Sequence, residues 1–275
     1  PMALLIQGES VVMFWGNYGT LWWAVLGLSV LSVLFVRVGL AHFQREELLG
    51  REIDVLNIRW GWRTFISEFK GEAKSIWQWY KIVIPGTIKG LRWSLLISLV
   101  LIIVGVWLGS LQVNTFNVSL EASGLGNLNA NLSSMAQMWP VGALGPVVAV
   151  FWQNLRVLLL GMVAGLLSFG ILGVIPLLAS VAVAGYLMAL LQANGMAIGV
   201  YLIGFILPHG IIEIPAVMLA TAAVMQAGVI LATPNHDQTI GEVWIRSIAN
   251  WAKIMVGVVI PMLVLSSMIE VWVTP

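Results

Sequence analysis

Long apolar stretches, separated by shorter polar ones, dominate the pattern of this chain. Residues 11–36 and 93–113 contain no Asp, Glu, Lys or Arg, and neither do the 56 residues between Arg156 and Glu213. A helix crosses the ~30 Å hydrocarbon core of a bilayer with about 20 apolar residues, so the longest stretch has room for two crossings and a turn. The pattern predicts an all-α fold, a polytopic bundle of about six transmembrane helices.

The expected helices have recognisable ends. A tight turn near Gly173 and Pro176 separates the third helix from the fourth, and Asn194-Gly195 is a typical C-terminal cap of the fourth. The predicted spans are residues 11–36, 93–113, 146–170, 174–193, 211–232 and 252–272.

The region before the fifth span is expected to be irregular. As one helix, residues 197–232 would be ~54 Å long, which exceeds the bilayer thickness. Pro208 and Gly210 interrupt the apolar pattern, and Pro215 removes one more backbone donor. We therefore predict a helix break at these residues, with a broken or re-entrant segment near 197–210. Either 197–207 is a re-entrant half-helix, or the whole unit 197–232 is sharply kinked.

Charge divides the chain into three regions. Residues 37–92 hold ten of the thirteen Lys and Arg residues and six of the twelve Asp and Glu residues. Because cytoplasmic loops are enriched in Lys and Arg, this segment is predicted to be cytoplasmic. The expected organisation is an N-terminal transmembrane helix in 1–36, this charged segment, and a five-helix domain in 93–275 with an external loop at 114–145.

The second half of the charged segment has the period of an amphipathic helix. One apolar stripe follows spacings of three and four residues. Its members are Phe65, Phe69, Ala73, Ile76, Tyr80 and Val83. A helix lying on the cytoplasmic leaflet would explain this stripe, and so would a helix packed under the protein itself.

Composition excludes several classes of protein. Of the 275 residues, 60% are hydrophobic and 9% are charged, whereas soluble domains carry about 25% charged residues. The chain has no cysteine, so disulfides and thiolate metal sites are unavailable. The charged segment mixes both signs, which argues against a nucleic-acid partner. Neither a nucleophile elbow nor a zincin motif nor a phosphate loop occurs, so no enzyme activity and no cofactor are predicted.

Few ionisable residues fall inside the predicted spans. They are Arg156, His209 and Glu213, with Lys253 and Glu270 at the margins. Each is costly in hydrocarbon unless it has a partner, so each is a candidate functional residue. His209 and Glu213 are four residues apart and share one helix face. That spacing suits an ion pair, two metal ligands or a proton relay.

We expect no metal here. A complete site needs three or four ligands, and His42 and His236 lie in predicted cytoplasmic segments. An intramembrane enzyme would likewise need a second ionisable group beside Glu213, which the sequence does not clearly supply.

The favoured interpretation of the polar cluster is structural. Glu213 would lie in the first turn of a helix, where free N–H groups favour a carboxylate. Arg156, beside Asn154, would act as its counter-ion, and the cluster would hold three helices together. The alternative is a transporter or channel with a polar path through His209, Glu213 and Arg156.

Three stretches resemble the stage II sporulation protein M family. They are "ILPHGIIEIPAVMLA" at 206–220, "FWQNLRVLLLGMVAG" at 151–165 and the "ANG" at 193–195. The resemblance covers about 60–275, and it implies a non-enzymatic membrane protein that positions other proteins in a remodelling complex. The residues that carry over from the family pattern are Asn154, Pro208, His209, Gly210, Glu213 and Pro215.

The N-terminal region departs from that family. The stretch "FQREELLGREID" at 43–54 is similar to the tail of ABC-type export permeases. This similarity implies membrane partners such as an ABC permease and its ATP-binding subunit, in a prokaryotic cytoplasmic membrane; a homo-oligomer also stays open. The residues expected to dock such a cytoplasmic partner are Arg45, Glu46, Glu47, Arg51 and Glu52. We expect a non-enzymatic subunit or scaffold of an exporter or of a cell-envelope remodelling assembly.

Overall fold

The computed structural model shows an all-α protein, as predicted. It describes residues 26–27, 29–30, 32–37, 39, 58–115, 142, 144–195, 198–233 and 239–273. The chain forms two compact units, one of residues 1–56 with 232–240 and one of residues 57–231 with 241–275. In the first unit, the described residues from 26 to 39 are helical, within and just beyond the predicted N-terminal span. The rest of that span and most of the predicted loop at 114–145 lie outside the described residues.

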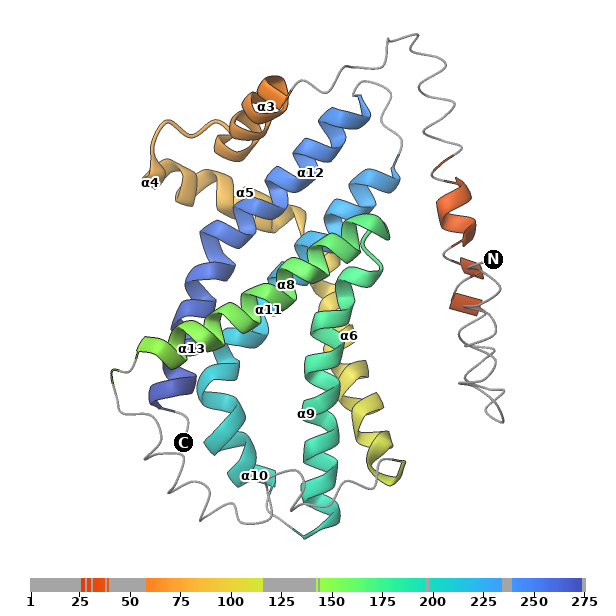
Figure 1. The fold of residues 1–275 in the computed structure, drawn as a ribbon, viewed down its shortest axis with the longest axis vertical. Coiled ribbons are helices and arrows are strands. Elements are labelled where there is room, and N and C mark those ends of the chain that lie inside the picture. The colour runs from red at the N-terminus through yellow and green to blue at the C-terminus, as the bar shows by residue number, and fades with distance from the viewer. Residues whose placement is uncertain are drawn as a thin grey trace. The chain divides into compact units, whose positions relative to one another are not determined.

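The second unit contains the helices that are labelled in Figure 1. They begin with α3 (Ile58–Lys70), α4 (Ile76–Gln78), η1 (Trp79–Val83), α5 (Ile84–Gly90), α6 (Arg92–Leu111) and η2 (Gln112–Asn114). They continue with α8 (Leu144–Leu167), η3 (Leu172–Val174), α9 (Ile175–Ala193), α10 (Ile198–Tyr201), η4 (Leu202–Ile206), α11 (Leu207–Ala232), α12 (Ile240–Ile254), η5 (Met255–Val259) and α13 (Ile260–Trp272).

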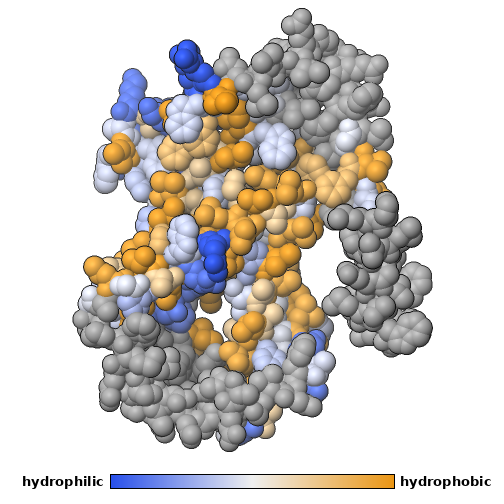
Figure 2. Space-filling view, in the orientation of Figure 1, coloured by the Kyte–Doolittle hydropathy of each residue, from blue (hydrophilic) through white to orange (hydrophobic). Residues whose placement is uncertain are grey.

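Five helical stretches in the described part of the chain are long and apolar enough to cross a membrane. They are Arg92–Asn114, Leu144–Leu167, Leu172–Ala193, Leu207–Ala232 and Gly241–Trp272. Most of their surface is hydrophobic, and hydrophilic residues gather near α3 and α4 in Figure 2. Because a bilayer is itself apolar, such exposed apolar helices are suited to lipid contact.

Glycines allow α6 and α9 to pack closely along their length. A Cβ atom on Gly109 would overlap the backbone of Ala182, and one on Gly185 would overlap the backbone of Val106. Small residues permit such close approach in membrane helices, where burial of apolar surface gives little driving force. The glycine-rich stretches therefore have the packing role that their composition indicates.

The amphipathic stripe is not one continuous helix. α3 ends at Lys70. The next residue, Gly71, has a left-handed φ of +58°, and its N–H donates to Ser67 O at 2.9 Å. The next helix, α4, has Ser75 as its N-terminal cap, and the Oγ of Ser75 accepts a hydrogen bond from the N–H of Gln78 at 3.2 Å. Phe69 and Trp79 then pack with ring centroids 5.2 Å apart, so the two pieces fold against each other.

The predicted helix break at Pro208 and Gly210 is wrong. The backbone is helical from Ile198 through Ala232, and Pro215 lies inside α11. The irregularity is a π-helical turn, η4, which ends two residues before Pro208. A proline ring conflicts with the carbonyl four residues earlier, and a wider turn can accommodate that conflict without ending the helix.

The same arrangement recurs twice. The π-helical turns η1 and η5 end two residues before Pro85 and Pro261. The helix containing η5 is also longer than predicted, because it begins at Ile240 and not near 252. Its polar first part is one amphipathic helix, with Val243, Ser247 and Ile254 on its buried face.

Candidate functional site

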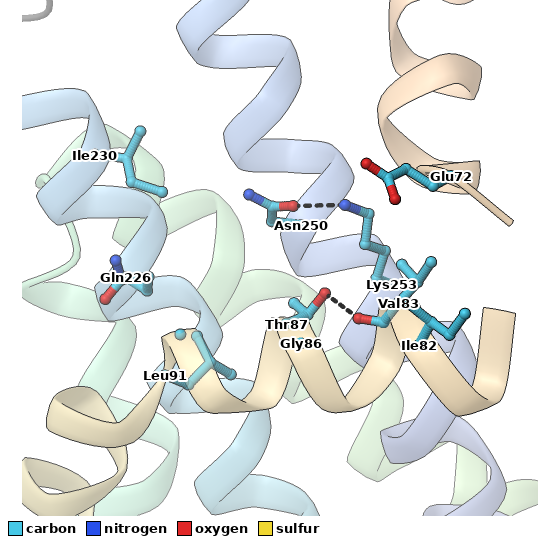
Figure 3. Close-up of a pocket in the computed structure, with 11 residues that line it drawn as sticks. Glu72, Ile82, Val83, Gly86, Thr87, Leu91, Gln226, Ile230, Asn250 and Lys253 are labelled. Atoms are coloured by element: carbon cyan, nitrogen blue, oxygen red, sulfur yellow. Dashed lines mark hydrogen bonds between the residues drawn. The ribbon is translucent and has the colours of Figure 1, made fainter. Parts of the chain in front are cut away.

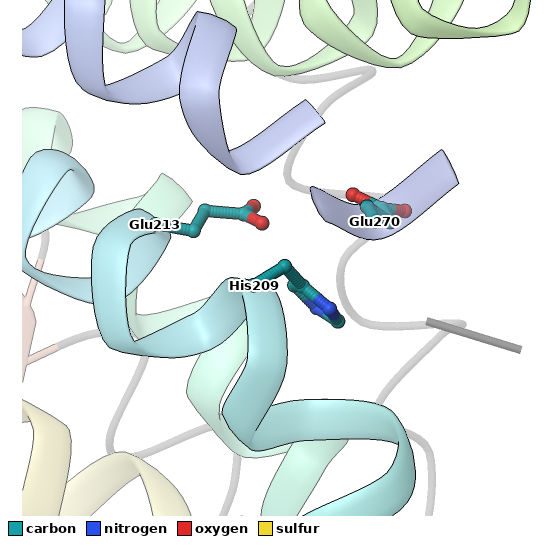
Figure 4. Close-up of side chains that lie close together, drawn as sticks. All are labelled: His209, Glu213 and Glu270. Carbon is teal, nitrogen blue, oxygen red and sulfur yellow. The ribbon is translucent and has the colours of Figure 1, made fainter. Parts of the chain in front are cut away.

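A histidine and two glutamates form a cluster between α11 and α13. His209 and Glu213 lie one turn apart on α11, and Glu270 lies on α13. One potential ligand atom from each residue lies within 4.8 Å of the other two, and all three side chains are half-buried. Figure 4 shows them converging from the two helices. The arrangement supplies one imidazole and two carboxylates.

A serine on α13 also reaches this cluster. Ser266 is fully buried, and its Oγ donates a hydrogen bond to Oε2 of Glu213 at 3.2 Å. Ser266 precedes Glu270 by four residues, which places both on the same face of α13. α13 therefore presents a donor and a carboxylate to the α11 pair, so the cluster couples two helices that are distant in sequence.

The position of Glu213 differs from the prediction. Because the helix begins well before Leu207, Glu213 does not lie in the first turn of a new helix, and an N-terminal cap does not explain it. Its polar contacts come from α13 and from its neighbours on α11.

The structure does not bring the predicted counter-ion to the cluster. Arg156 is exposed on α8, and its Nη2 donates to Oε1 of Gln153 at 2.6 Å. Asn154 is half-buried on the same helix. The cluster thus links α11 to α13, and the expected three-helix arrangement with Arg156 is not formed. Arg45, Glu46, Glu47, Arg51 and Glu52, the predicted docking residues, lie outside the described residues.

Sequence reasoning placed Glu270 at a margin and did not join it to His209 and Glu213. The order of the spans does predict that Glu270 lies near His209 and Glu213. α11 and the helix Ile240–Trp272 are consecutive spans, so the start of the first and the end of the second belong at the same side of a bilayer. No metal was expected because the sequence offered only His209 and Glu213 as ligands, and in the structure Glu270 is a third potential ligand.

A second polar region lines a pocket of about 390 Å³ between α5, α11 and α12, drawn in Figure 3. Lys253 is 7% exposed, and its Nζ donates to Oδ1 of Asn250 at 2.8 Å. Gln226 also lines the pocket and accepts a hydrogen bond from Ser94 Oγ at 3.3 Å. Glu72 lies on the same side of the pocket as Lys253 in Figure 3. Neither Asn250 nor Gln226 was predicted to have a role.

An apolar layer separates the two polar regions. Lys253 and Glu270 are 17 residues apart on one continuous helix, and His209 and Gln226 are 17 residues apart on the other. In a helix, 17 residues span about 26 Å. The buried side chains between them form the hydrophobic core, and they include Ala216, Ala220, Ala222, Ile254, Val259 and Leu263. The separation approaches the thickness of a bilayer core, so the two regions are spaced like its two faces.

These features define a multi-pass α-helical membrane protein with polar regions near both ends of α11 and of the helix that follows it. Residues 94–275 match the family described as Stage II sporulation protein M, which is about two thirds of the chain. The chain belongs to this family. The match does not include α3, α4 or the N-terminal region, so the similarity of that region to export permeases stays a prediction. No curated protein and no solved structure matches the chain.

Proposed function

We propose that the chain is a non-enzymatic subunit that works inside a larger complex of the prokaryotic cytoplasmic membrane. The observation that carries this proposal is the apolar layer between the two polar regions. Ala216, Ala222, Ile254, Val259 and Leu263 each have 0% exposure in that layer. A transport path would need polar groups or water along its length. A closely packed layer favours a rigid scaffold over a continuous polar path.

The surface of the second unit offers a place for partners. α3 has no buried residue, and Trp62 and Trp77 are 64% and 68% exposed beside the lysines of this segment. Exposed aromatic and basic residues suit either lipid headgroups or a protein partner. The partner that we propose is an ABC-type exporter or a cell-envelope remodelling assembly, which docks on the cytoplasmic segment 37–92.

An enzymatic role needs separate consideration, because Glu270 supplies the second ionisable group that an intramembrane enzyme would require. The hydroxyl in the cluster belongs to Ser266, which is 0% exposed and donates to Glu213. A nucleophile must reach its substrate, so this serine is poorly placed for catalysis. We retain the non-enzymatic proposal on that ground.

The test combines co-purification with reconstitution. The full chain, isolated from its own membrane, is expected to bring with it an ATP-binding cassette subunit or a cell-wall hydrolase. Glu213→Gln is expected to reduce the recovered partner while the protein inserts normally. Ser267→Ala, which changes a buried serine bonded to Leu263 O on the same helix, is the matched control and should retain the partner.

The rival function gives a different result. If the purified chain alone moved cations or small solutes across liposomes, and Glu213→Gln abolished that flux, the chain would be a transporter and the scaffold proposal would be overturned. Recovery of undiminished partner with Glu213→Gln would show that the cluster has no part in assembly.

A further inference from the structure

We propose that His209, Glu213 and Glu270 bind a divalent transition-metal ion of the Zn²⁺ class, which joins the start of α11 to the end of α13. This inference goes beyond the proposed function and does not depend on any partner. It rests on the convergence of three ligand side chains from two helices and on the balance of charge around the two carboxylates.

The geometry suits a metal with three protein ligands. Zn²⁺ binds His nitrogen and carboxylate oxygen at about 2.0–2.2 Å, which places tetrahedral ligands roughly 3.4 Å apart. The ligand atoms here lie within 4.8 Å of one another, so binding requires them to approach by at most about 1.4 Å. Glutamate has three side-chain torsions by which to make such an approach. Three protein ligands leave a further position for water or for a group from a partner.

A bound cation would balance the negative charge of Glu213 and Glu270. Glu213 and Glu270 lie close together near the ends of apolar spans, where two ionised carboxylates would repel each other strongly. Three Lys and Arg residues occur after position 92. Arg156 donates to Gln153 and Lys253 donates to Asn250. Arg246 precedes Glu270 by 24 residues on one helix, roughly 36 Å away.

The ligand set also indicates the class of ion. One imidazole with two carboxylates suits Zn²⁺ or Mn²⁺ better than Ca²⁺ or Mg²⁺, which prefer oxygen ligands and more of them. Ser266, bonded to Glu213, would orient that ligand in the way that outer hydrogen bonds commonly do. In the predicted topology the site faces the external side, because the segment 37–92 is expected to be cytoplasmic.

The first experiment measures Zn²⁺ binding by the full chain in detergent, after removal of metal with a chelator. We expect one Zn²⁺ per chain by titration calorimetry and elemental analysis. Glu213→Gln, Glu270→Gln and His209→Ala should each weaken binding by at least about tenfold. Glu72→Gln makes the same chemical change at an exposed residue of the other polar region, and it should bind Zn²⁺ like the unaltered chain.

The second experiment uses the absence of cysteine from the chain. With Co²⁺ as the probe, Glu270→Cys should change the absorption spectrum of the bound ion, because it replaces one of the three ligands. A sulfur-to-cobalt charge-transfer band in the near ultraviolet is expected where the shorter Cys side chain reaches the ion. Glu72→Cys, measured in the same way, should give no such band. This gain of a signal does not require a variant that loses binding, and size-exclusion profiles show that each variant is folded.

Three results would overturn the proposal. They are no Zn²⁺ binding by the unaltered chain, Zn²⁺ binding that none of the three substitutions weakens, and a Co²⁺ spectrum of folded Glu270→Cys protein that is identical to the spectrum of the unaltered chain. None of these results would bear on co-purification of a partner, so the two proposals fail separately.

Discussion

The two polar regions lie on the same two helices, yet they satisfy their charged groups in different ways. Lys253 bonds Asn250, three residues earlier on its own helix, so this contact is local. Glu213 bonds Ser266, 53 residues away on another helix, and it meets Glu270 there as well. The Lys253–Asn250 bond can form within a single helix, although the pocket around it also needs α5 and α11. The cluster of His209, Glu213 and Glu270 exists only when α11 and α13 are docked. The integrity of this cluster therefore shows whether α11 and α13 are correctly packed.

The largest effect is expected from damage to the apolar layer between the two regions. Leu263 is 0% exposed, and Leu263→Ala should lower the free energy of unfolding by about 2–5 kcal/mol, because it leaves a cavity. Unfolding in mixed micelles, followed by circular dichroism, measures the loss.

Leu265 provides the control, because it is 53% exposed on the same helix. Leu265→Ala should change the stability by less than about 1 kcal/mol. Equal losses at both positions would mean that the layer is not packed, and the comparison of two separate regions would fail.

A smaller loss of stability is expected when Lys253 loses its hydrogen-bond acceptor, Asn250. Asn250→Leu removes the acceptor of the Lys253 Nζ donor and should destabilise the protein by about 2–3 kcal/mol, since a buried ammonium is left without that bond. The double change Asn250→Leu with Lys253→Met replaces both partners and should recover most of the loss. If the double variant were as unstable as the sum of the single ones, the pair would not be coupled.

The difference between the regions also explains what the sequence could predict. The spans at 93–113, 146–170 and 174–193 were placed to within a few residues, because length and apolarity decide them. The cap at Asn194-Gly195 was correct as well, since Gly195 has a φ of +71°. These features depend on neighbours in the sequence.

The errors concern features that depend on tertiary structure. Pro208 looked like a helix break, but the π-helical turn η4 lets the helix continue. His209 and Glu213 were chosen correctly as one helix face, whereas their neighbour Glu270 could be found only by pairing two spans. Arg156 was assigned to Glu213 by charge alone, and the structure gives it a partner one turn away on α8.

A moderate effect is expected from the serine that joins α13 to the cluster. Ser266→Ala removes the hydrogen bond to Glu213 and should destabilise the protein by about 1.5 kcal/mol, because the acceptor is a carboxylate. In the presence of Zn²⁺ it should also weaken metal binding, by about 10-fold or more. Thermal unfolding with and without Zn²⁺ separates the two effects.

Ser267→Ala is the matched change for this prediction. Ser267 is also fully buried, but its Oγ bonds Leu263 O within the same helix at 2.8 Å. Its loss should leave Zn²⁺ binding unchanged. A weaker affinity in both variants would mean that the serines act through packing and not through Glu213.

The smallest effect, and the one of opposite sign, concerns Thr221 in the apolar layer. Thr221 is 2% exposed, and within the described part of the chain its Oγ1 has no hydrogen-bond partner. Thr221→Val keeps the shape of the side chain and removes the buried hydroxyl, so it should stabilise the protein by about 1 kcal/mol. Thr87→Val is the contrasting change, because Thr87 Oγ1 donates to Val83 O at 2.8 Å and loses that bond. If Thr221→Val instead destabilised the protein, the Thr221 hydroxyl would have a water or another polar partner in the middle of the apolar layer. A continuous polar path between the two polar regions would then describe the protein better than a packed apolar layer.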